Sequence, residues 1–131
     1  FTFLRLYTII TILIEKREEI MTYEANLNAL LVALADDYSD WSGKASINNI
    51  PAPEFIVESG RMYDKIMKVD RAQKCAVGFV CKKDNPKKGF TTGDLLMAAS
   101  YSAPATNFAR GNIFELEDAV ARGMVRWCGI G

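Results

Sequence analysis

Two strand patterns around one short turn make up the sequence Arg61-Met-Tyr-Asp-Lys-Ile-Met-Lys-Val-Asp-Arg-Ala-Gln-Lys-Cys-Ala-Val-Gly-Phe-Val-Cys81. Alternating residues and many β-branched and aromatic side chains predict an antiparallel hairpin that turns at residues 70–73. The second strand, Lys74–Cys81, is apolar on both faces and should lie in the middle of a sheet. Alternation predicts two faces for it: Cys75, Val77, Phe79 and Cys81 on one, and Ala76, Gly78 and Val80 on the other.

Two further strands extend the hairpin into a sheet. Phe55–Glu58 precedes it across a Ser59-Gly60 turn, and Leu95–Ala98 follows it after a lysine-rich loop. Since each strand follows its neighbour along the chain, we expect an antiparallel meander. The segment Asp40–Pro53, which is rich in glycine, asparagine and proline at its end, is predicted to connect to the first strand without regular structure.

Helical patterns flank the strands. Thr22 is the expected N-cap of an amphipathic helix over Tyr23–Tyr38. Asn112 is expected to cap a second helix that ends at Gly123, with Met124–Trp127 as a last edge strand. The first helix should bury one stripe: Leu27, Leu30, Leu31, Leu34 and Tyr38. The predicted class is α+β, an antiparallel four-stranded meander with a preceding amphipathic helix and a C-terminal helix plus edge strand.

Residues 1–20 have an apolar composition that resembles a membrane or targeting segment. Arg5 and the charged run Glu15–Glu19 leave their apolar stretch shorter than the roughly 20 residues that a membrane span needs. The codons of Lys16–Met21 can form a purine-rich ribosome-binding site and a start codon. We therefore expect residues 1–20 to be a translated leader and residues 21–131 to be a single α+β domain. If residues 1–20 are instead an ordered appended segment, they should pack on the domain as a strand or helix.

The composition excludes several kinds of chemistry. There is no histidine, which rules out Ser-His-Asp and Cys-His catalysis and histidine-containing zinc sites. The three cysteines, Cys75, Cys81 and Cys128, form no C-x-x-C pair, so we expect reduced thiols and a cytoplasmic compartment. We predict no metal and no cofactor, and a non-enzymatic role is favoured over an enzyme. The 16 basic and 16 acidic residues balance, so nucleic-acid binding would require a local patch.

The candidate site lies in residues 92–114. The start of the second helix presents free amides, so Arg110, Gly111 and Asn112 could hold an anion, beside Ser100 and Tyr101 of the preceding loop. Alternatively, Arg110 pins this loop through carbonyl groups or Asp94. A second loop offers possible phosphate contacts, or simply a solvated surface, with four lysines: Lys82, Lys83, Lys87 and Lys88.

Three blocks of the chain resemble small uncharacterised proteins of tailed bacteriophages. They are Gly60-Arg-Met-Tyr63, Val77-Gly-Phe-Val80 and, above all, Gly93-Asp-Leu-Leu-Met-Ala-Ala-Ser-Tyr-Ser-Ala-Pro-Ala105 with Ala109-Arg-Gly-Asn-Ile-Phe114. The resemblance implies a phage origin and brings no activity with it. In that group the positions of Met97 and Thr106 are often lysine and that of Tyr101 is often tryptophan. This chain therefore lacks two positive charges that a phosphate-binding role would use.

These observations favour a small, non-enzymatic phage accessory protein in the cytoplasm of the infected bacterium. It would bind a host protein or a nucleic acid through the Ser100–Asn112 loop and the Lys82–Lys88 loop. One alternative is a small-molecule enzyme or sequestering protein with a pocket beside Ser100–Asn112. A second alternative is a minor virion protein. No membrane partner is expected, and the oligomeric state is left open.

Overall fold

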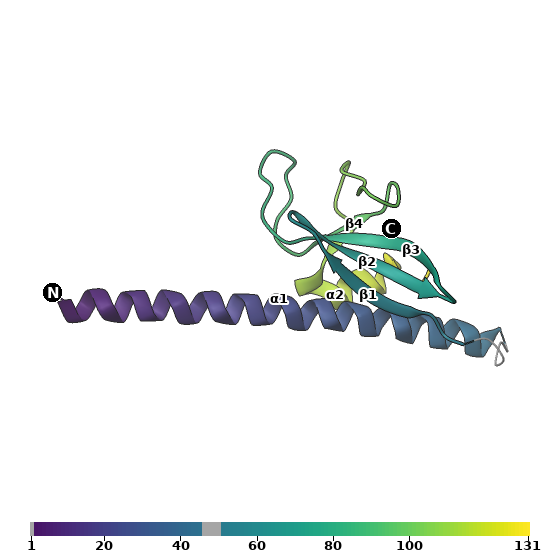
Figure 1. The fold of residues 1–131 in the computed structure, drawn as a ribbon, viewed down its shortest axis with the longest axis horizontal. Coiled ribbons are helices and arrows are strands. Elements are labelled where there is room, and N and C mark those ends of the chain that lie inside the picture. Colours follow the sequence, from purple (N-terminus) through teal and green to yellow (C-terminus); the bar gives the residue numbers. More distant parts are fainter. Residues whose placement is uncertain (1, 46–50) are drawn as a thin grey trace.

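A computed structural model describes residues 2–45 and 51–131, which are drawn in Figure 1. Within these residues a long helix lies along one face of a five-stranded antiparallel sheet, and two loops rise from the other face. The elements are α1 (Thr2–Lys44), β1 (Glu54–Ser59), β2 (Tyr63–Asp70), β3 (Gln73–Cys81), β4 (Asp94–Met97), β5 (Gly111–Asn112), the 3₁₀ helix η1 (Ile113–Glu115), α2 (Leu116–Ala121), β6 (Val125–Arg126) and β7 (Gly129–Ile130). The predicted α+β class is confirmed.

The main sheet follows the predicted meander. Its strand order is β1-β2-β3-β4-β5, so β3 is central as expected. The turn between β2 and β3 consists of Arg71 and Ala72, and both residues have the positive φ angles of a tight hairpin turn. Beyond the four expected strands, Gly111–Asn112 adds a short fifth strand on β4. The C-terminal strand was expected at an edge, but β6 pairs with β7 in a hairpin separate from the main sheet.

Helix α1 is longer than the predicted helix Tyr23–Tyr38. The prediction of Thr22 as its N-cap is wrong, because Thr22 lies inside the helix. The helix continues in both directions, since no glycine or proline interrupts residues 2–42. The irregular connection predicted over Asp40–Pro53 is therefore wrong at Asp40–Lys44, the last turn of α1, while residues 46–50 of that connection lie outside the described residues.

The N-terminal part of α1 extends beyond the sheet (Figure 1). Residues 2–20 are helical, as one of the expected alternatives has it, but this part does not pack on the sheet. The apolar side chains of residues 5–17 are 46–73% exposed: Leu6, Tyr7, Ile9, Ile10, Ile12, Leu13 and Ile14. The hypothesis that Met21 is the native start stays a prediction, and the N-terminal mass of the protein made from its natural gene would test it.

The inner face of the sheet, defined as the face against α1, carries the main core. Here the predicted stripe of α1 meets aliphatic side chains of the strands and of η1. Leu31 of that stripe is only partly buried, whereas its other four members are at most 8% exposed. The side chains at the centre of this core are 0% exposed: Leu30, Leu34, Ile66, Val80, Leu95 and Ile113.

The predicted faces of β3 are wrong at Val77. Val77 packs in the inner core, whereas alternation had grouped it with Phe79. The register between β2 and β3 shifts between Ile66 and Met67, which leaves Val77 as an extra residue in a β-bulge. A bulge interrupts the two-residue alternation, so the side-chain pattern of one strand could not place Val77.

The outer face of the sheet, defined as the face away from α1, has a smaller core. Four buried residues form it: Phe79, Cys81, Phe90 and Leu96. Phe90 comes from the loop between β3 and β4, and Ala98 and Ala109 cover the cluster from the loop between β4 and β5. The two loops are therefore the only described cover of this face.

The C-terminal hairpin is attached to α1. The backbone N–H of Trp127 donates to Asp37 over 2.9 Å, and the Trp127 ring lies 5.1 Å from the ring of Tyr38 and 4.8 Å from that of Trp41. Trp41 therefore packs against the C-terminal hairpin. Gly123 has φ +74° and terminates α2 in the left-handed conformation, as predicted.

Candidate functional site

The two loops on the outer face contain most of the residues predicted for a site. We call residues 82–93 the lysine loop and residues 98–110 the small-residue loop. Figure 1 shows both loops on the side of the sheet away from α1. Each loop is anchored by an apolar contact with the outer core, so each is held at its base and presents its remaining side chains to solvent.

The lysine loop is folded back on itself. Asn85 and Phe90 form an isolated antiparallel bridge, and the Phe90 side chain is 4% exposed. The carboxylate of Asp84 accepts hydrogen bonds from the backbone N–H (2.8 Å) and the hydroxyl (2.9 Å) of Thr92. These two bonds lower the pKa of Asp84 below its ordinary value. The loop therefore has a defined shape although its tip is solvated.

The four predicted lysines fall into two groups. Lys83, Lys87 and Lys88 are exposed, and none of their ammonium groups has an ion pair or side-chain hydrogen bond with any described residue. Lys82 is half-buried and donates to the Ser59 hydroxyl over 2.8 Å and to the Gly60 carbonyl over 3.1 Å. The first three lysines are available to a partner, whereas Lys82 helps to hold the β1–β2 turn.

In the small-residue loop, Ser100 holds a turn. Its hydroxyl oxygen accepts from the backbone N–H groups of Ser102 (3.3 Å) and Ala103 (3.1 Å). Tyr101, at the tip of this turn, is 52% exposed, and the ammonium of Lys65 lies 3.5 Å from the centre of its ring. Tyr101 is therefore solvent-facing and also held on one face of its ring by a cation.

Arg110 is turned into its own loop. It is 6% exposed, its guanidinium donates to the side chain of Asn107 and to the carbonyl of Phe108, and it lies 3.6 Å from the centre of the Phe108 ring. These partners match the alternative in which Arg110 pins the loop through carbonyl groups. The expected alternative partner Asp94 instead accepts from Asn112, over 3.0 Å.

Gly111 and Asn112 also have structural partners. A Cβ atom at Gly111 would come within 2.9 Å of the Ala119 side chain, so the close contact of β5 with α2 requires glycine. Asn112 acts as a cap, since its side-chain oxygen accepts from the N–H of Phe114 over 2.8 Å, but it caps the 3₁₀ helix η1 that leads into α2 and not α2 itself. The N–H of Ile113 donates to the carbonyl of Gly93. This geometry favours the structural interpretation of Arg110–Asn112, and anion binding there stays a prediction.

A cleft that no pattern in the sequence had predicted lies between α1 and the sheet. Its volume is about 610 Å³, and Tyr23, Leu27, Val57, Asp64 and Thr92 are among the residues that line it. The hydroxyl of Tyr23 donates to the carboxylate of Asp64 over 2.6 Å, and Asp64 is only 3% exposed. Burial and the hydrogen bond to this carboxylate raise the pKa of Tyr23. The sequence carried one signal for this contact. Asp64 is on the strand face that was predicted to carry Ile66, and a carboxylate buried on that face needs a partner.

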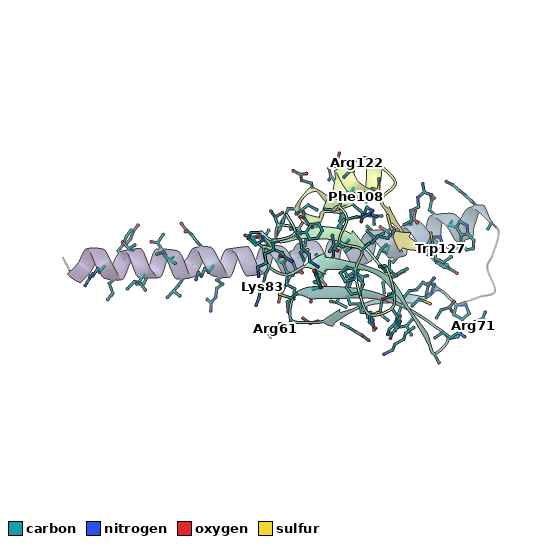
Figure 2. The ribbon with its side chains drawn as sticks, turned by 90° about the horizontal axis from the view of Figure 1, so that it is seen from above. Arg61, Arg71, Lys83, Phe108, Arg122 and Trp127 are labelled. Atoms are coloured by element: carbon teal, nitrogen blue, oxygen red, sulfur yellow. The ribbon has the colours of Figure 1, made fainter. Side chains whose placement is uncertain are left out.

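Charge is unevenly distributed although the whole chain is neutral. Residues 61–110 contain ten basic and four acidic side chains, a net charge of +6, and the rest of the chain carries −6. Three of these four carboxylates accept hydrogen bonds within the fold: Asp64, Asp84 and Asp94. Figure 2 shows Arg61 and Lys83 at one end of the sheet and Arg71 at the other. The β2–β4 region and its loops therefore form the basic part of the molecule.

Two kinds of feature are absent from the described residues. Residues 2–45 and 51–131 contain no group of three or more His, Cys, Asp or Glu side chains placed to hold a metal ion. Within the same ranges, no helix has both the length and the apolar character that crossing a membrane requires.

Comparison with known proteins identifies a family. A family of unknown function (DUF7717) matches residues 12–130. The chain belongs to this family. The DUF7717 match extends from the N-terminal part of α1 to β7, so it covers both loops and the cleft, and it also includes residues 12–20. No curated protein and no solved structure matches the chain. The function of the DUF7717 family is unknown, so membership assigns no activity to the chain.

Proposed function

We propose that this protein is a non-enzymatic binding module that contacts a nucleic acid through the outer face of its sheet. The observation that carries the proposal is the group of exposed lysines on the lysine loop, Lys83, Lys87 and Lys88, within a segment, residues 61–110, of net charge +6. A local basic surface attracts phosphates even when the whole chain is neutral, because exposed charges act over a Debye length of about 10 Å or less. The phage resemblance adds a setting: an accessory protein in the cytoplasm of the infected bacterium.

The lack of described ion-pair partners around the exposed lysines supports the proposal. Three exposed lysines of the lysine loop have no described acidic partner, so binding a phosphate would not require an ion pair to be broken first. The neighbouring segment 95–109 carries no charged residue. No carboxylate of that segment would therefore repel a phosphate backbone lying across the outer face.

A salt titration tests the proposal. The full chain is mixed with labelled mixed-sequence DNA and RNA, and binding is followed by gel shift between about 50 and 200 mM salt, where a protein with several phosphate contacts loses affinity steeply. The variant Lys83→Gln/Lys87→Gln/Lys88→Gln should bind weakly with a shallower salt dependence. Lys44→Gln, which changes a lysine at the end of α1, is the matched control and should bind as the wild type does.

Two results would overturn the proposal. One is the absence of any retained nucleic acid at the lowest salt concentration. The other is salt-independent binding that the triple lysine variant leaves unchanged. A host protein recovered by pull-down through the same loops, without nucleic acid, would favour the host-protein function expected from the sequence instead.

The cleft favours a second candidate function, small-molecule binding. Its volume of about 610 Å³ is within the usual range for ligand pockets, roughly 300–1,000 Å³. It combines the buried Asp64 carboxylate and the half-buried Tyr23 hydroxyl with apolar walls from Leu27 and Val57. Unlike the pocket expected beside Ser100–Asn112, it lies between α1 and the sheet. A metabolite that raises the melting temperature of the wild type and of Arg110→Ala, but not of Asp64→Asn, would support this function.

A further inference from the structure

We infer that the outer face selects single-stranded nucleic acid, with bases stacked on Tyr101 and Phe108 and phosphates near the lysine loop; this inference rests on the proposed function. Tyr101 and Phe108 are 52% and 56% exposed, and both belong to the small-residue loop. Exposed aromatic side chains on a well-anchored loop are typical of contact residues, since burying them on binding is favourable.

Each of the two rings is held by a cation. The Lys65 ammonium lies 3.5 Å from the centre of the Tyr101 ring, and the Arg110 guanidinium carbon lies 3.6 Å from the centre of the Phe108 ring. A cation at this distance covers one face of a ring, so the exposed surface belongs to the other face and the edge. That face is available for stacking against a flat base.

The backbone around the rings is also fixed. Ala98 and Pro104 form an isolated bridge, and the N–H of Ala105 donates to the carbonyl of Met97 over 2.7 Å. On the Phe108 side, its N–H donates to the side chain of Asn107 over 3.0 Å. Because ring and backbone are ordered before binding, little conformational entropy is lost when a base stacks.

Stacking distinguishes a single strand from a duplex. In a duplex the faces of the bases are covered by their neighbours, whereas an unpaired strand can present them to aromatic side chains. The phosphates of that strand would meet Lys83, Lys87 and Lys88 at their exposed ammonium groups. Aromatic side chains combined with a basic surface are the usual means by which proteins bind single strands without reading their sequence.

Fluorescence anisotropy with the full chain tests the inference. The probes are fluorescein-labelled oligo-dT and oligo-U of about 20 nucleotides, and a duplex of the same length, because a site of this size can occupy only part of such a strand. We expect at least one of the single strands to bind about tenfold or more tightly than the duplex. Tyr101→Ala should weaken single-strand binding by about 5- to 100-fold, the usual effect of losing one stacked base. Phe108→Ala should have an effect in the same range.

Three controls separate stacking from folding and charge. Tyr101→Phe keeps the ring and should bind within about twofold of the wild type, because the ring face makes the stack. Tyr7→Ala removes a tyrosine of α1 that is 73% exposed and should change nothing. Tyr101→Ala should leave the slope of log affinity against log salt unchanged. The triple lysine variant should make this negative slope shallower by about two, since each phosphate contact of a single strand contributes about −0.7.

The two proposals fail in different ways. If no nucleic acid binds, the proposed function itself is wrong. If the duplex binds as tightly as the single strands, and Tyr101→Ala and Phe108→Ala bind like the wild type, the outer face binds nucleic acid by charge alone and the stacking inference is wrong. If correctly folded Tyr101→Ala binds single strands as tightly as the wild type does, Tyr101 is not a stacking residue.

Discussion

The two faces of the sheet are built differently. The inner face is closed by a helix whose Leu30 and Leu34 are 0% exposed, together with β-strand residues that are equally buried. The outer face has a cluster of four buried residues under two loops, and it leaves Tyr101 and Phe108 about half exposed. Apolar burial thus concentrates the stability on the inner face, while the outer face keeps side chains available for a partner.

Hydrogen bonds hold the outer loops in addition to their apolar contacts with the outer core. The N–H of Thr91 donates to Asp94, the N–H and hydroxyl of Thr92 donate to Asp84, and Arg110 bonds to the loop before it. A typical intramolecular hydrogen bond contributes only about 0.5–1.5 kcal/mol. The outer loops should therefore open locally at a lower free energy than the inner core, which is the usual condition of a binding surface.

The largest expected effect tests the inner face. Leu30→Ala should lower the free energy of unfolding by about 3 kcal/mol, because it leaves a cavity in a fully buried core. Urea denaturation measures the loss. Val32→Ala on the same helix is the control, since Val32 is 59% exposed and surface substitutions usually change stability by about 0.5 kcal/mol or less. Similar losses for both variants would contradict the assignment of the main core to the inner face.

A smaller effect is expected on the outer face. Phe90→Ala should cost about 2 kcal/mol, less than is usual for a buried Phe, because the lysine loop can move into the vacated space. The same variant should speed modification of the buried Cys81 thiol by a thiol reagent, whereas Lys87→Ala should affect neither stability nor thiol reactivity. A loss larger than that of Leu30→Ala would reverse the comparison of the two faces.

Tyr23→Phe tests the polar contact between the helix and the inner face. Removing the hydroxyl that bonds to buried Asp64 should cost about 1–2 kcal/mol at pH 7, because Asp64 loses a donor. Burial and this bond raise the folded pKa of Tyr23 above its ordinary value of about 10. The stabilisation is thus fully present below pH 10 and decreases as pH rises above it.

Urea denaturation from pH 7 upward measures the difference in the free energy of unfolding between wild type and Tyr23→Phe. This difference should become smaller above about pH 10. Burial, with a smaller contribution from Asp94, also raises the pKa of the Cys81 thiol to about 11, so Cys81→Ala is run in parallel to separate its alkaline effect. The hydroxyl of Tyr101 makes no hydrogen bond to a buried carboxylate among the described residues, so Tyr101→Phe should have the same free energy of unfolding as the wild type at neutral pH. A constant difference for Tyr23→Phe at all pH values would argue against a buried neutral phenol.

The smallest expected effect concerns the hydrogen bonds of the lysine loop. The two bonds from Thr92 lower the folded pKa of Asp84, so its stabilisation is present above the ordinary pKa of an aspartate, about 3.9, and is lost as pH falls through the folded value. Asp84→Ala should have a slightly lower melting temperature than wild type at pH 7, and the two should converge in strong acid. Asp70→Ala, which changes an exposed carboxylate at the end of β2, is the control and should have about the melting temperature of the wild type at pH 7. A pH-independent difference for Asp84→Ala would mean that the carboxylate charge is not what holds the loop.

The sequence predicted a good part of this fold and some of the candidate site. The meander, the central position of β3, the cap at Asn112 and the left-handed Gly123 follow from alternation and from local capping chemistry. The two outer loops were chosen from their lysines and small residues, and the pinning of Arg110 to carbonyl groups was one of two stated alternatives. These features depend on residues close together in the chain.

The remaining features depend on contacts between residues that are far apart in the chain. The face of Val77 depends on its register with β2, and the partner of Asp64 is Tyr23, 41 residues away. The fifth strand depends on β4, because two residues carry no strand pattern of their own. The two faces of the sheet also differ through what covers them, since a helix closes one face and loops close the other. Local sequence therefore determined the elements and their order, and long-range packing decided which side chains are buried and which remain free to bind.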